Sequence, residues 1–281
     1  MSRVLLSSAL AVIVVAGAPR AASVEMVDSG HPYQSASGIQ DWCKDAGSYS
    51  DRSETFCEVR TLTGAATGRL EADTSNGSIA VTGTSRRDVS IQARVIAYAG
   101  SMADARELAG DVDVTLEGGR MRATGPRNSG LMRRSGWHVS YRVEVPSQYD
   151  LSLETSNGSV SVTDVKGAID TESSNGSLRL TNLAGRVSAR TSNGSVEVQV
   201  SGTRWDGDGL TVVTSNGSAR LDLPESYNAN LIVGTSNGRI NLDFPVTVQG
   251  TIGRRLETTL GSGGPTLEVR TSNGSVRVGR R

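Results

Sequence analysis

The stretch Thr74-Ser75-Asn76-Gly77-Ser78, TSNGS, decides the fold because the chain repeats it. The same five letters begin again at Thr155, Thr191, Thr214 and Thr271, with the variants SSNGS at Ser173 and TSNGR at Thr235. A catalytic motif normally occurs once in a chain, whereas a short motif that recurs along the chain is typical of a repeated structural unit. We therefore interpret this motif as a backbone corner that the fold uses again and again.

The spacing of the corners defines the repeating unit. The asparagines of the motif are Asn76, Asn157, Asn175, Asn193, Asn216, Asn237 and Asn273, at intervals of 81, 18, 18, 23, 21 and 36 residues. The basic unit is therefore 18 residues long, and the interval of 36 predicts two units, one of them degenerate. The interval of 81 must contain an additional segment.

Apolar and polar residues alternate on both sides of each corner. In the second copy, Leu151 and Leu153 precede the corner and Val160 and Val162 follow it, with polar residues between them. Period-two alternation indicates strands with one buried face, so each unit contributes two short strands. A unit of this size cannot bury its own apolar face and must stack on a neighbour.

Two arrangements would stack such units. Asn-Gly is a strong hairpin signal, which suggests an antiparallel meander. In a solenoid, each unit is one coil and equivalent residues lie in parallel about 4.8 Å apart. We favour the solenoid, because only stacked coils bring identical corners together, where asparagines form hydrogen-bonded ladders. The predicted fold is all-β, a parallel, right-handed β-helix-like solenoid with coils of about 18 residues.

The corners carry further conformational expectations. Asn and Gly tolerate a left-handed backbone, so we expect that conformation at the TSNG corners. A second, looser corner is expected at DVKG, which ends at Gly167, and at NLAG, which ends at Gly185.

The segments without the repeat suggest the domain organisation. Residues 101–110 (SMADARELAG) predict one short helix, inside an insert spanning about residues 93–145. A second insert at 244–265 is expected to cover the degenerate coil. The predicted domains are a signal peptide at 1–22, a disulfide-containing segment at 23–60 and the repeat domain at 61–281.

The N-terminus predicts export. Arg3, an apolar run from Val4 to Ala18 and following small residues are typical of a secretory signal, and the run is short for a membrane span. We therefore expect a periplasmic, extracellular or cell-envelope protein without a membrane span in the mature chain. In such an oxidising compartment, the only two cysteines, Cys43 and Cys57, should form a disulfide.

From about Cys57 to its C-terminus, the chain resembles the bacterial DUF4097-type β-strand repeat proteins, which are labelled adhesins. The resemblance rests on the helix-bearing insert, on VEVPSQYDLSLETSNGSVSVTDVKG from Val143 and on the serial TSNGSV coils. It implies a β-helix-like solenoid in an exported or envelope protein. It supplies no catalytic residue to carry over.

The composition limits the classes of partner and cofactor that we expect. Acidic and basic residues balance at 29 each, so no net field favours nucleic acid, and we expect no nucleic-acid partner. His31 and His138 are the only histidines and are interpreted as surface or core residues. Asp206 and Asp208 suggest a calcium loop but lack its remaining ligands, so we interpret them as a plain loop and expect no metal or cofactor.

One carboxylate cluster is a candidate ligand face. If the coils stack, Glu154 and Glu172 share one outward column and Asp170 lies beside them. Paired carboxylates on a β-helix face are used by glycan-cleaving enzymes. The competing interpretation is a solvated face, with Arg179 and Arg190 as counter-charges.

Two functions follow as hypotheses. The first is a non-enzymatic exported cell-envelope protein, an adhesin-like or scaffold module whose partner is an unidentified envelope or surface protein or glycan. An open terminal coil would accept a further strand, and Arg277, Arg280 and Arg281 would protect the C-terminal end against it. The alternative is a glycan-acting or divalent-ion-binding enzyme that uses the carboxylate column.

Overall fold

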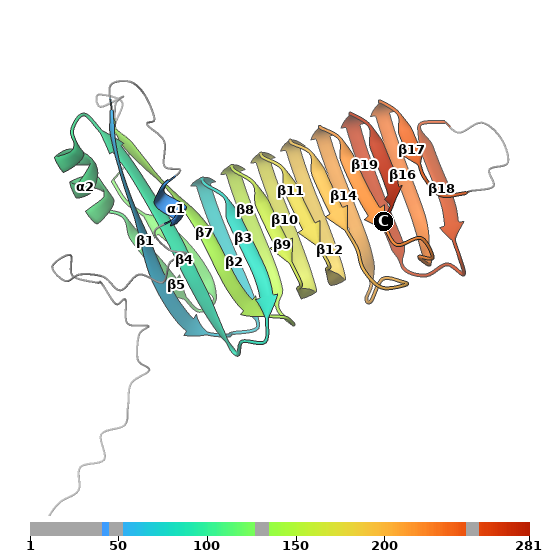
Figure 1. Ribbon diagram of the computed structural model, residues 1–281, viewed down its shortest axis with the longest axis horizontal. Coiled ribbons are helices and arrows are strands. Elements are labelled where there is room, and N and C mark those ends of the chain that lie inside the picture. Colours follow the sequence, from blue (N-terminus) through green and yellow to red (C-terminus); the bar gives the residue numbers. More distant parts are fainter. Residues whose placement is uncertain (1–40, 45–52, 127–134, 246–252) are drawn as a thin grey trace, which may run out of the picture.

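The computed structural model describes residues 41–44, 53–126, 135–245 and 253–281, and the predicted signal peptide lies outside them. Two ten-stranded sheets form from the described residues and face each other in an elongated molecule (Figure 1). The apolar side chains between the sheets make one continuous core. The prediction of an all-β protein is therefore confirmed.

The two sheets, A and B, each mix parallel and antiparallel strands. The spatial order in sheet A is β1 (Glu54–Ala65), β4 (Asp88–Ala99), β7 (Gly136–Pro146), β3 (Ile79–Thr84), β9 (Val160–Thr163), β11 (Leu178–Thr181), β13 (Val196–Gln199), β15 (Ala219–Leu223), β20 (Val276–Arg280) and β17 (Ile240–Leu242). The order in sheet B is β18 (Arg255–Leu260), β16 (Ala229–Asn237), β19 (Thr266–Asn273), β14 (Gly209–Asn216), β12 (Ala184–Asn193), β10 (Lys166–Asn175), β8 (Asp150–Asn157), β2 (Arg69–Asn76), β6 (Arg120–Thr124) and β5 (Asp113–Glu117).

In the middle of the molecule, each repeat places one strand in each sheet, and equivalent residues pair in parallel. Asn157 pairs with Asn175, and Asn175 pairs with Asn193. The inward positions stack in the same register, so that Ile169 lies between Leu151 and Val187, all of them buried. Because the side-chain period of a strand is two, a slip of one residue would turn every one of these side chains to solvent.

The repeats do not follow one another in sequence order. The last repeat, β19 and β20, lies between its two predecessors: β19 pairs with β14 and β16, and β20 pairs with β15 and β17. In Figure 1 the C-terminus accordingly lies within the stack of strands and not at its end. One expectation is therefore wrong. Arg277, Arg280 and Arg281 do not guard an open end, because β17 is the edge strand of sheet A.

The prediction of a degenerate coil at 244–265 is also wrong for the residues of that segment that the structure describes. Its described strand is β18, which runs antiparallel to β16 and closes the edge of sheet B. This return strand lets the chain re-enter the stack, so the final repeat fits against β14 instead of extending the end. Residues 246–252 of this insert lie outside the described residues.

The insert in the long interval builds the N-terminal end of the molecule. The predicted helix is α2 (Met102–Gly110), which begins after Ser101, whose hydroxyl accepts a hydrogen bond from the Asp104 N–H at 3.2 Å. Sheet A continues beyond the first coil as an antiparallel set, β7, β4 and β1. The predicted boundary at residues 60/61 falls inside β1, so the cysteine-bearing segment and the repeat domain share a strand.

A disulfide holds the short helix α1 (Asp41–Lys44) on the outer face of sheet A. Cys43 is bonded to Cys57 of β1, as expected. Trp42 lies against two guanidinium groups. The centroid of its ring is 5.0 Å from the Cζ of Arg94 and 4.0 Å from the Cζ of Arg142. The Arg94 Nη1 also donates to the Trp42 carbonyl at 2.8 Å, so cation–π contacts and a hydrogen bond reinforce the covalent link.

The two kinds of corner differ from the expectation in their backbone. Among the described residues that are not glycine, only Asp164 and Asn182 have positive φ, at 57° and 52°, and both lie in the second corners. The TSNG asparagines are not left-handed, so the expectation is wrong for them, and among the corner glycines only Gly77 and Gly274 have positive φ, at 151° and 155°. Glycine is needed at most of these corners because of close approach: a Cβ on Gly176 would lie 1.8 Å from the carbonyl oxygen of Gly158.

A search of the described residues for membrane-crossing helices finds none with the length and apolar character required.

Candidate functional site

The stacked corners form a continuous asparagine ladder along one edge of the molecule. Each asparagine donates its Nδ2 hydrogen to the Oδ1 of the neighbour nearer the N-terminal end, as from Asn157 to Asn76, Asn175 to Asn157 and Asn193 to Asn175, each at 3.0 Å. The series continues through Asn216, Asn273 and Asn237 at 2.9–3.0 Å. All the amides therefore point the same way, which gives the ladder a donor end and an acceptor end.

A second ladder of buried hydroxyls lies just inside the first. Thr191 donates to the carbonyl oxygen of Gly176 at 2.9 Å, and Thr214 donates to that of Gly194 at 2.9 Å. Equivalent bonds run from Ser173, Thr155, Thr235 and Thr271. These hydroxyls satisfy glycine carbonyls that a purely apolar side chain would leave without a partner in the core.

We expect Asn175→Ala, in the middle of the ladder, to lower the free energy of unfolding by about 1–3 kcal/mol, because it removes one donor and one acceptor from the stack. Urea unfolding of the oxidised protein measures the change. Ser174→Ala, at the neighbouring exposed position, is the control and should change stability by less than about 0.5 kcal/mol. Equal stability of the two variants would show that the ladder contributes nothing.

The outer face of sheet B carries the candidate carboxylates. Glu154 and Glu172 are register partners on β8 and β10, and Glu172 pairs on its other side with Arg190. Glu154 and Glu172 are exposed, and Asp170 lies half-buried two residues before Glu172 on the same face. Within the described residues, no cluster of three or more carboxylate, histidine or cysteine groups is arranged to hold a metal ion.

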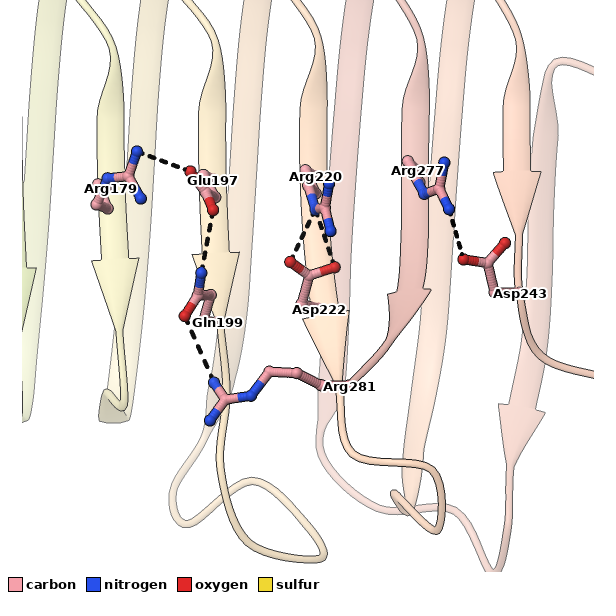
Figure 2. A network of polar contacts seen from close by, with 8 residues as sticks. All are labelled: Arg179, Glu197, Gln199, Arg220, Asp222, Asp243, Arg277 and Arg281. Atoms are coloured by element: carbon pink, nitrogen blue, oxygen red, sulfur yellow. Dashed lines mark hydrogen bonds and ion pairs between the residues drawn. The ribbon is translucent and has the colours of Figure 1, made fainter.

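The outer face of sheet A carries a network of charged and polar side chains (Figure 2). Arg179 belongs to it, on β11, so the expectation that Arg179 is a counter-charge of the carboxylate column is wrong, because that column lies on sheet B. Arg179 pairs with Glu197 at 3.0 Å, Gln199 donates to the same carboxylate at 3.0 Å, and Arg281 extends to Gln199 at 3.5 Å. The exposed contacts contribute little stability individually.

Asp222 differs from its neighbours in this network because its side chain is only 6% exposed. Arg220 donates to both of its carboxylate oxygens through Nε, at 2.8 and 3.0 Å, and this hydrogen bond raises the pKa of Arg220. Gly279 on β20 leaves room for the carboxylate, since a Cβ there would lie 2.6 Å from the Asp222 Oδ1. A larger residue at this position would therefore have to push the Asp222 carboxylate aside.

Burial shifts the pKa values of two tyrosines and one histidine toward the uncharged form. Burial raises the pKa of Tyr227 to about 12, and burial together with the Asp73 charge raises the pKa of Tyr141 above its usual range. Burial lowers the pKa of His138, and the positive charge of Arg94 lowers it further.

Each end of the stack has a hollow. At the β17 end, a cavity of about 570 Å³ is lined by residues 240–245 and Leu256. At the other end, a cavity of about 270 Å³ is lined by residues 73–76, Ala123, Gly125, Pro126 and residues 137–139. Neither was predicted, because both depend on where the parallel stack stops.

The repeats stack in parallel, their corners are joined by side-chain hydrogen bonds, and each repeat contributes one strand to each of two sheets. These features define a class of β-repeat proteins built from stacked units. The family model Toastrack DUF4097 matches residues 55–279, and the chain belongs to this family. The resemblance seen in the sequence is therefore confirmed.

The chain is also similar to solved structures at low identity. A putative cell adhesion protein from Clostridium sporogenes is 10% identical, covering 81% of this chain and 100% of that one, with a TM-score of 0.41. Putative adhesins from Parabacteroides distasonis (10% identity, 79% and 97% coverage, TM-score 0.38) and Bacteroides fragilis (10%, 80% and 97%, 0.32) are similar in the same way. No curated protein matches the chain.

Proposed function

We propose that this chain is a non-enzymatic, exported cell-envelope protein whose parallel middle is a right-handed β-solenoid acting as a rigid, adhesin-like scaffold. The Cys43–Cys57 disulfide supports an oxidising compartment outside the cytoplasm. The two ladders support rigidity, because every corner is hydrogen-bonded to the next through side chains as well as backbone. Membership of the family adds the expectation of an envelope location.

The observation that carries the proposal is the vacant strand position beside β17. Among the described residues, which exclude 246–252, sheet B extends past β16 to β18, whereas sheet A stops at β17 and is one strand shorter at this end. The cavity beside β17 is lined by the half-buried Ile240 and Leu242 and by the buried Phe244. A free edge above apolar side chains is the usual acceptor for strand addition by a partner.

The hydrogen bonds of β17 show which of its backbone groups are available. The Val276 N–H donates to the Arg239 carbonyl, and the Asp243 N–H donates to the Val278 carbonyl, so the odd-numbered residues face β20. In a parallel ladder successive residues face opposite neighbours, which leaves the N–H and C=O groups of Ile240 and Leu242 for an incoming strand. We propose that this strand is an extended segment of an envelope or surface protein.

Leu242→Pro tests this proposal because it removes an edge N–H that makes no bond within sheet A. We expect the oxidised mature chain of this variant to keep its melting temperature within a few degrees. It should capture at least tenfold less partner from envelope extract than the wild type does. In the wild type, the captured partner should also protect the Ile240 and Leu242 amides from hydrogen exchange. Asn241→Ser, on the same strand, is the control that leaves both edge groups in place.

Capture that is unchanged in Leu242→Pro, or that leaves the two amides unprotected, would contradict strand addition at β17. Loss of capture by Asn241→Ser would contradict it as well, because that residue's backbone groups face β20.

The carboxylate face supports the alternative proposal of a glycan-acting or divalent-ion-binding enzyme. Its specific observation is the register pairing of Glu154 with Glu172, beside Asp170. A calcium-dependent rise in melting temperature that Glu154→Gln/Glu172→Gln removes would favour this function. A melting temperature independent of calcium in both proteins would count against it.

A further inference from the structure

The asparagine ladder ends at the corner of Asn237. In sheet B, β16 is followed by β18, which pairs with β16 only from Ala229 to Gly234 and so stops short of this corner. Among the described residues, Asn237 therefore has a neighbouring corner on one side, that of Asn273, and none on the other. Its Nδ2 donates to the Asn273 Oδ1 at 2.9 Å, so its side chain is held from that side alone.

The backbone of the corners shows the same contrast. At five corners the glycine N–H donates to the carbonyl oxygen of the next asparagine in the stack, at 3.0–3.2 Å: Gly77, Gly158, Gly194, Gly217 and Gly274. Gly176 makes no bond of this kind, but it is half-buried, and the side chain of Asn175 is hydrogen-bonded on both sides. Gly238 is exposed, unlike the six other corner glycines, and no described residue accepts a hydrogen bond from its N–H.

An asparagine that precedes a glycine lies next to a nucleophile. The glycine nitrogen can close a five-membered ring on the side-chain amide carbon, and glycine has no Cβ to obstruct the approach. The nitrogen must first lose its proton to the solvent, and the asparagine side chain must rotate toward the main chain. A hydrogen bond from the glycine N–H and the side-chain bonds of the ladder oppose these steps, because they have to open before the ring can close.

We propose that Asn237 is a site of spontaneous deamidation in the folded protein, and that the stack protects the six other Asn-Gly corners. The Gly238 nitrogen bonds to the Asn237 Cγ, the Cγ–Nδ2 bond breaks, and ammonia leaves with the proton that the glycine nitrogen gave up. Water then opens the resulting succinimide at one of its two carbonyl carbons, which gives aspartate or isoaspartate. Overall the reaction consumes water and releases ammonia, without an oxidant or a cofactor.

The product alters the corner that joins β16 to β17. A carboxylate cannot donate, so the hydrogen bond from Asn237 to Asn273 is lost. Isoaspartate also lengthens the main chain of the corner by one atom, because the chain then runs through the side-chain carbons. The inference goes beyond the proposed function, since it concerns a covalent change of the free protein and requires no partner at β17.

Peptide mass spectrometry of the oxidised protein, incubated at mildly alkaline pH, tests the proposal. Cleavage after arginine and lysine places each of the seven corners in a separate peptide, with Asn237 in residues 221–239. We expect Asn237 to deamidate about tenfold faster or more than any other corner. Asn76, at the opposite end, should be protected because the Gly77 N–H donates to the Asn157 carbonyl. In urea the seven rates should agree within about threefold, since the local sequences are nearly the same.

Arg239→Ser is the matched variant, because it gives the last corner the same TSNGS sequence as most of the others. Arg239 is exposed, so we expect the variant to fold and Asn237 to remain the fastest site. Loss of the preference in this variant, or the same preference in urea, would show that the local sequence sets the rate and not the open end of the stack. Deamidation of Asn76 or of an inner corner as fast as that of Asn237 in the folded protein would also overturn the proposal.

Discussion

Gly176→Val should lower the free energy of unfolding by about 3 kcal/mol or more, the largest effect we expect from a single substitution at a corner. A Cβ at this position would lie 1.8 Å from the carbonyl oxygen of Gly158 and 2.5 Å from its carbon, and both are backbone atoms. They cannot move aside as a flexible side chain would, so two coils would have to separate locally. Urea unfolding, monitored by far-ultraviolet circular dichroism, measures the loss.

Gly100→Val is the matched control for this prediction. Gly100 follows β4, and a Cβ placed on it meets no atom within 4 Å. We expect this variant to unfold within about 1 kcal/mol of the wild type. Similar losses in the two variants would mean that valine acts through general chain effects and that the corners are not in close contact.

Removal of the disulfide should have the second-largest effect. Cys43 and Cys57 are 14 residues apart, and closing a loop of that length stabilises a folded chain by about 3 kcal/mol in the chain-entropy model. Reduction frees α1 from β1 and leaves the contacts of Trp42 with Arg94 and Arg142 to hold the helix on sheet A. We expect the urea midpoint to fall when dithiothreitol is added.

The double variant Cys43→Ala/Cys57→Ala separates this effect from other actions of the reductant. It should unfold at the midpoint of the reduced wild type and show no response to dithiothreitol. An unchanged midpoint on reduction would show that α1 detaches before the sheets unfold, in which case the disulfide stabilises the helix alone.

The carboxylate column illustrates how far a candidate site can be predicted from sequence. Stacking places Glu154 beside Glu172, and period-two alternation turns both outward, so their pairing follows from the repeat alone. The contacts of Asp222 could not be predicted in this way. Its burial depends on Gly279, which belongs to a strand that lies 57 residues further along the chain but adjacent in the sheet.

The sequence by itself determined the local geometry. Seven similar corners, alternating apolar positions and one helix-forming segment specify the paired strands, their buried faces and α2, because these depend on side-chain periodicity and on residues close together in the chain. The sequence also located the disulfide, since there are only two cysteines to pair.

Only the tertiary structure decided which repeats are neighbours and where the stack ends. Corners with the same sequence hydrogen-bond equally well to any other copy, so the motif cannot specify the order of the coils. The chain returns through β18, and the last repeat pairs on both sides inside the stack, β19 with β14 and β16 and β20 with β15 and β17. The position of β17 at the edge of sheet A results from that long-range arrangement, which no local pattern encodes.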